Sequence, residues 1–171
     1  MLAYTFDNGI LSITDSDKTN ITREDIENIL LNDNIKLVHT VELISKSIKR
    51  IENSAFFYMG IKNFNCYHGT KLEYIGKNAF ANNNIDLIDL PSSIEYVDDN
   101  AFANNNITDI LNHKYFNTIK FGKNVFNNNK INIKYNITEI NKKKGDIKSP
   151  KIIINLFNDE KIIEIFGNQT I

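Results

Sequence analysis

Cys66 and His68 are the residues of this sequence whose types most directly offer chemistry, because thiolate and imidazole bind zinc and also pair in nucleophilic catalysis. A Cys-x-His pair alone does not have the spacing of a zinc site, and no second pair of ligands lies nearby. Cys66 also falls in the core-facing column of an expected strand, where a buried cysteine acts as a small hydrophobic residue. We therefore expect neither a bound metal nor a catalytic cysteine.

Other motifs for chemistry are also missing from the sequence. Its seven glycines match neither a phosphate-binding loop nor a dinucleotide-binding fingerprint, and no serine lies in a G-x-S-x-G turn. A net charge of −1 argues against general binding to nucleic acid, and the basic run 142–144 is typical of a solvated loop. No stretch is long and apolar enough for membrane insertion, and the first residues lack a signal-peptide pattern. We predict a protein that is not an enzyme and uses no cofactor.

The remaining candidates lie on the outer surface of a predicted parallel sheet. In a strand of the pattern I-x-x-I-x-L, the x positions face away from the core, and repeat proteins bind partners on such extended faces. The predicted partner-binding residues are Lys62, Asn63, Asp86, Leu87, Asp89, Thr108 and Asp109. The three aspartates make the middle of this face mildly acidic, and Leu87 and Leu111 would add apolar contacts. The alternative is a face that is merely solvated.

The elements that would position these residues follow from an internal repeat. A phenylalanine recurs at intervals of 24, 22 and 24 residues, at Phe56, Phe80, Phe102 and Phe126. An apolar residue lies five positions before and five positions after each phenylalanine. An asparagine follows three positions after the last three, at Asn83, Asn105 and Asn129. A unit this short cannot bury its own apolar residues, so stacked copies must share one core.

The copy from Ile85 to Ile107 is the clearest unit. Its I-x-x-I-x-L segment predicts a short strand that stops at Pro91, which lacks an N–H group. The spacing of the apolar residues that follow mixes three and four, which favours a helical or 3₁₀ turn on the opposite wall. We expect the phenylalanine to fill the interior of the coil and the asparagine column to bond backbone groups at the bend.

This pattern, IxxIxLPSSIxxVxxxAFxxNxI, resembles the BspA-like leucine-rich repeats of bacterial and some protist surface proteins. The resemblance covers about residues 38–133. It implies an α/β solenoid, a short right-handed coil with a parallel sheet on one side, in a cell-surface or secreted protein with a role in adhesion or protein recognition. The sequence departs from the family pattern because only the middle coil has the proline, and because Asn112 stands where an apolar residue is expected.

We predict that residues 1–171 form one leucine-rich-repeat domain in three parts. Residues 1–37 would be an N-terminal cap, with a hairpin turning at Asn8-Gly9 and a helix that begins after Thr22 as N-cap, with Asp25 completing a capping box. Residues 38–137 would hold about four repeats. Residues 138–171 would be a C-terminal cap, a β-hairpin built from the runs KIIINLF and KIIEIFG.

Two hypotheses for function follow from this reading. The first is a non-enzymatic module for recognition or adhesion that binds a protein through the sheet face. The second is a structural or self-assembling unit, a homodimer that associates through the C-terminal hairpin, because an apolar strand at an uncovered edge pairs readily with another copy.

Overall fold

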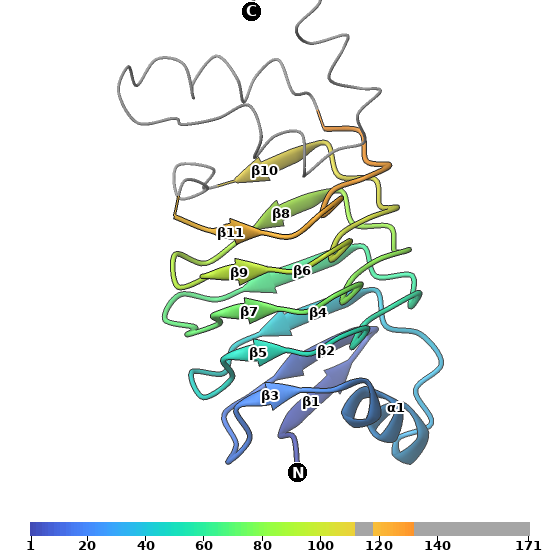
Figure 1. Cartoon of the computed structure of the whole chain (residues 1–171). Helices are drawn as coiled ribbons and strands as arrows, with labels where there is room; N and C mark the ends of the chain where they lie inside the picture. Colours follow the sequence, from blue (N-terminus) through green and yellow to red (C-terminus); the bar gives the residue numbers. More distant parts are fainter. Residues whose placement is uncertain (112–117, 132–171) are drawn as a thin grey trace, which may run out of the picture.

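The computed structural model describes residues 1–111 and 118–131 as a β-solenoid (Figure 1). The chain passes back and forth between two sheets, and each new strand lies beside the strand of the coil before it. The six-stranded sheet has the order β1 (Tyr4–Asp7), β2 (Ile10–Ile13), β4 (Thr40–Leu43), β6 (Asn63–Cys66), β8 (Leu87–Asp89) and β10 (Asp109–Leu111). The five-stranded sheet contains β3 (Asn20–Ile21), β5 (Arg50–Ile51), β7 (Tyr74–Ile75), β9 (Tyr96–Val97) and β11 (Lys120–Phe121).

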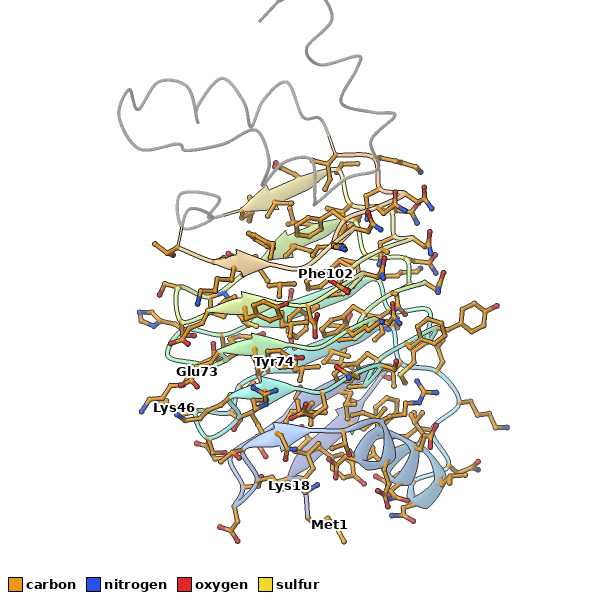
Figure 2. All side chains as sticks on the ribbon, in the orientation of Figure 1. Met1, Lys18, Lys46, Glu73, Tyr74 and Phe102 are labelled. Carbon is orange, nitrogen blue, oxygen red and sulfur yellow. The ribbon has the colours of Figure 1, made fainter. Side chains whose placement is uncertain are left out.

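The predicted stack of phenylalanines fills the space between the two sheets. Phe56, Phe80, Phe102 and Phe126 are fully buried, and each ring stacks on the next with centroids 5.0, 5.3 and 5.7 Å apart. The inward residues of the strands surround them in register, for example Phe64 beside Ile88 and Ile88 beside Ile110. The repeat therefore has the physical basis that its spacing predicts: equivalent apolar side chains share one continuous core (Figure 2, where Phe102 is labelled).

The asparagine column forms the predicted hydrogen-bond ladder at the bend of the coils. The buried Asn105 side chain donates from Nδ2 to the carbonyl oxygens of Phe80 and Phe102, at 2.9 and 3.0 Å, and accepts at Oδ1 from Ile85 N–H at 3.0 Å. Asn83 and Asn129 bond in the same way one coil below and one coil above. Each amide thus satisfies backbone groups of two coils at a corner where the regular ladders end.

The wall opposite the six-stranded sheet corrects one of the predictions. We predicted a helical or 3₁₀ turn there, with a parallel sheet on one side only, but the chain forms a second parallel sheet and then an irregular turn. In that turn the N–H groups of Phe56, Phe80 and Phe102 bond to carbonyl oxygens of the next coil, at 2.8, 2.8 and 2.9 Å. Local bonds of the i→i+3 type also close the turn, such as Ala79 N–H to Gly76 O and Ala81 N–H to Asn78 O, both at 3.1 Å, but they form single turns and not a continuous helix.

Asparagines in the left-handed conformation allow this turn. Two positions in each regular coil have φ between 55° and 58°, at Asn78, Asn82, Asn100, Asn104, Asn124 and Asn128. Asparagine tolerates this conformation better than most residues do. The second asparagine of each pair also bonds from coil to coil. The Asn104 side chain donates to that of Asn82 at 2.9 Å, and the Asn128 side chain donates to that of Asn104 at 2.7 Å.

The N-terminal hairpin and helix are present at the predicted residues. β1 and β2 pair antiparallel across the Asn8-Gly9 turn, where both residues have positive φ as a type I′ turn requires. Helix α1 (Arg23–Asn32) begins at Thr22, which forms a capping box with Asp25. β2 and β3 already pair in parallel with the next coil.

The predicted C-terminal hairpin, and the dimer that would use it, lie outside the described residues. The division of the chain at residues 37 and 137 likewise stays a prediction. Within 1–111 and 118–131, no helix has the length and apolar character needed to cross a membrane.

Candidate functional site

The outer face of the six-stranded sheet carries the residues predicted to bind a partner. Parallel register places outward side chains in two rows across the strands. One row contains Thr40, Asn63, Leu87 and Asp109, and the other contains Ser12, Glu42, Asn65, Asp89 and Leu111. Of the predicted residues, Asp89 is half-buried and the others are exposed. Lys62, Asp86 and Thr108 lie immediately before the strands, at the same edge of the face.

The half of this face nearest the N-terminus is held by contacts among its own side chains. Glu42 accepts from Ser12 Oγ at 2.8 Å and from the Tyr67 hydroxyl at 2.9 Å. Asn63 Nδ2 donates to Thr40 Oγ1 at 3.2 Å. These bonds fix the orientation of polar groups that a partner would otherwise have to order.

The other half of the face presents four side chains in a square that we call the Leu–Asp square: Leu87, Asp89, Asp109 and Leu111. Leu87 lies opposite Asp109 and Asp89 lies opposite Leu111, so each leucine has an aspartate as its cross-strand neighbour. Leu87 is 42% exposed and Leu111 is 41% exposed, although both belong to regular strands. Exposed leucines beside carboxylates suit a partner that offers apolar groups together with Lys or Arg.

The outer face of the five-stranded sheet carries a column of large side chains that our sequence analysis missed. The guanidinium carbon of Arg50 lies 3.8 Å from the centre of the Tyr74 ring. Tyr74 stacks on Tyr96 with centroids 5.8 Å apart and planes inclined by 5°. Lys120 lies next to Tyr96 in register. We call these four residues the Arg–Tyr column; each lies one position before a buried or half-buried apolar residue, and that shared position could have revealed it.

Hydrogen bonds hold the Arg–Tyr column in place. The Tyr74 hydroxyl donates to Asp98 Oδ2 at 2.8 Å, and Arg50 bonds to Glu52 at 3.0 Å. Burial and the hydrogen bond to Asp98 raise the pKa of Tyr74 to about 12. Figure 2 labels Tyr74 on β7. Arg50 and Tyr74 on this face thus have their polar groups bonded to carboxylates beside the same sheet.

The residues that could have done chemistry have structural surroundings. Burial raises the pKa of the Cys66 thiol, with Asp89 adding to the shift, so the thiolate needed for a nucleophile or metal ligand is disfavoured. The ring of His39 lies 3.0 Å from both Asn8 O and Thr40 Oγ1, through its two nitrogens. Within the part of the chain that the structure describes, no group of three or more His, Cys, Asp or Glu residues could hold a metal ion.

Comparison with known proteins identifies the family of repeats to which the chain is similar. The profile of the BspA type leucine rich repeat region matches residues 26–144 in six copies, which is more than half of the 171 residues. No curated protein matches the chain. The crystal structure of the pneumococcal vaccine antigen PcpA is similar, with 17% sequence identity and a TM-score of 0.45. That match covers 74% of this chain and only 45% of the PcpA chain, so the sequence spans less than half of that relative.

Proposed function

Because the chain belongs to the BspA type leucine-rich repeat family, we propose that it is a non-enzymatic module that recognises a protein partner through the outer face of its six-stranded sheet. The family resemblance implies adhesion or protein recognition, and it supports placing the module at a cell surface. The β1–β2 hairpin and α1 would serve as the N-terminal cap that an exposed solenoid end requires. The binding residues would be those predicted from the sequence, with Leu111 added.

The Leu–Asp square is the observation that carries this proposal. A solvated sheet face usually alternates buried apolar residues with polar ones, and it gains nothing from two leucines that remain about 40% exposed. An apolar centre with a charged rim is typical of protein interfaces. Asp86 and Thr108 lie beside the square, and the Thr108 N–H donates to Asp86 O at 2.9 Å, which holds the two strand entries side by side.

The neighbouring strand would extend the binding surface. Lys62 and Asn63 are exposed at the start of β6, one strand away from Leu87. Strands in a sheet are about 4.8 Å apart, so a partner that covers the square also reaches these residues. Lys62 is the basic side chain among the predicted binding residues. The charge of the face therefore changes from negative at β8 and β10 to positive at the start of β6.

Charge reversal with a matched control tests this assignment. The test protein carries Asp86→Lys and Asp109→Lys, and the control carries Glu73→Lys and Glu95→Lys, which change the net charge equally from residues flanking β7 and β9 in the other sheet. Each protein is used to capture partners from lysate and culture supernatant of the source cells, followed by mass spectrometry. We expect a protein that binds the wild type and the control but is lost with the test variant.

A second measurement addresses the leucines directly. With the captured partner purified, Leu87→Ser and Leu111→Ser should each weaken binding by about tenfold, since a well-buried interface leucine is worth roughly 1–2 kcal/mol. A partner that binds the wild type, both charge variants and both serine variants equally would show that this face is not the binding surface.

A further inference from the structure

Strand β1 forms an edge of the six-stranded sheet, because among the described residues it pairs only with β2. The bond from Thr14 N–H to Ala3 O, at 3.0 Å, shows which residues of this antiparallel pair exchange hydrogen bonds. These residues alternate along the strand, so Thr5 and Asp7 turn their backbone groups towards β2. Tyr4 and Phe6 therefore turn their N–H and C=O groups towards the open edge.

The open edge lacks three of the features that commonly protect an edge strand, namely lysine, proline and a bulge. Lysine, proline and bulges blunt such edges in many proteins, whereas β1 reads Tyr-Thr-Phe-Asp and pairs with β2 without a bulge. Tyrosine, threonine and phenylalanine all favour extended structure. Unpaired backbone groups on such a strand are a template for an additional extended chain.

The surroundings of this edge are acidic. Residues 1–37 contain seven Asp and Glu against three Lys and Arg, a net charge of −4 in a chain whose total is −1. Asp7 lies on the strand itself, and Asp33 accepts from the Tyr4 hydroxyl at 2.7 Å. A pocket of about 120 Å³ lies between the start of β1 and helix α1, with Tyr4, Asp25 and Asn28 among its lining residues.

The unpaired backbone of β1 and the negative charge around it together indicate what kind of chain would bind there. The backbone edge requires an extended chain, and the negative charge favours a chain that carries lysine or arginine. A second copy of this protein would bring another acidic end to the same place, and repulsion between the two ends disfavours that pairing.

We propose that the open edge of β1 binds an extended, positively charged segment of a protein partner as an added strand. The backbone of that segment bonds to Tyr4 and Phe6, and its basic side chains lie against Asp7 and Asp33. This edge is at the far end of the sheet from the Leu–Asp square, so it is a second binding site, separate from the proposed function (Figure 1).

A synthetic peptide with alternating lysines, acetyl-KTKVKTK-amide, tests the backbone pairing with the full chain. Alternate N–H groups of an added strand face β1, so two peptides are compared, one N-methylated at the odd positions and one at the even positions. We expect one of them to bind about tenfold more weakly by fluorescence anisotropy and the other to bind like the parent, because only one set of N–H groups bonds to β1. Equal behaviour of the two methylated peptides, or no binding of the parent peptide, would overturn the proposal.

Two protein variants test the position of the site. Asp7→Lys should lower the affinity for the parent peptide about fivefold at low salt, and this difference in affinity should shrink as the salt concentration rises. Asp109→Lys, at the other end of the same sheet, should leave the affinity within about twofold. Weakening by Asp109→Lys alone would instead place the peptide on the Leu–Asp square and would contradict binding at β1, while leaving the proposed function standing.

Discussion

The two outer faces of the solenoid use their side chains differently. On the five-stranded sheet, Arg50 lies over the Tyr74 ring and Tyr74 stacks on Tyr96, while Arg50 and Tyr74 bond to neighbouring carboxylates. On the last two strands of the six-stranded sheet, Leu87 and Leu111 are each about 40% exposed. The five-stranded face therefore covers large side chains by contacts among themselves, whereas the six-stranded face leaves two leucines exposed where we propose that a partner binds.

Parallel register explains how one backbone supports both arrangements. Equivalent positions of successive coils lie directly opposite each other, so like residues at one position form a stack, as Tyr74 and Tyr96 do. In the Leu–Asp square the residues alternate, and Leu87 faces Asp109 while Asp89 faces Leu111. This alternation keeps the two carboxylates from lying directly opposite, which would be destabilising, and it also prevents the leucines from covering each other.

The largest expected effect comes from the residue that lies beneath both faces. Phe102→Ala should lower the free energy of unfolding by about 3–5 kcal/mol, because it removes a fully buried ring between Phe80 and Phe126 and leaves a cavity. Chemical denaturation followed by circular dichroism measures the change. Leu111→Ala is the matched control, with an expected cost of about 0.5 kcal/mol or less. A loss below about 1 kcal/mol for Phe102→Ala would mean that the two faces do not share one core.

A pair of truncations compares the two faces directly. Tyr74→Ala should cost about 2–3 kcal/mol, since it removes a ring stack, a cation–π contact and a hydrogen bond to a carboxylate. Leu87 is the first, outward-facing residue of β8, as Tyr74 is of β7. Leu87→Ala should change the free energy of unfolding by about 0.5 kcal/mol or less. Equal costs at the two positions would remove the distinction between a face for stability and a face for binding.

The core and the bend could be predicted because their residue types repeat. Each phenylalanine recurs with apolar residues five positions to either side, and Asn83, Asn105 and Asn129 recur at one offset from it. A repeat that short must stack its copies, so burial of the rings and pairing of the amides followed from the spacing alone.

The second sheet could not be predicted because its strands contain only two residues each, as in β7 (Tyr74–Ile75). Two residues cannot show an alternating pattern, and the pairing of these strands depends on bonds between coils, about which local spacing carries no signal. The Arg–Tyr column was missed for a related reason, since its four positions hold three different residue types and only the middle two are alike.

The outward residues of the six-stranded sheet were predicted individually, but their mutual arrangement was not. Alternation within a strand shows that Leu87 and Asp109 point outwards. That they lie opposite each other depends on the register between β8 and β10, which the contacts of the whole coil set.

The smallest of these effects isolates one hydroxyl group on the five-stranded face. Tyr74→Phe keeps the ring stack and the cation–π contact but removes the hydrogen bond to Asp98, so at neutral pH it should lower the free energy of unfolding by about 1 kcal/mol.

The contribution of this hydroxyl depends on pH, because the pKa of Tyr74 is about 12 in the folded state, against 10.0 for an ordinary tyrosine. Between these values the folded state binds more protons than the unfolded state, so the stability that the hydroxyl contributes is complete below pH 10 and is lost as the pH rises through 12. The free energy of unfolding of both proteins, measured from about pH 8 to about pH 11, should therefore show a difference that narrows above about pH 10. A difference that stays constant over that range would show that the hydroxyl is not held by Asp98, and that the Arg–Tyr column is stabilised by its ring and guanidinium contacts alone.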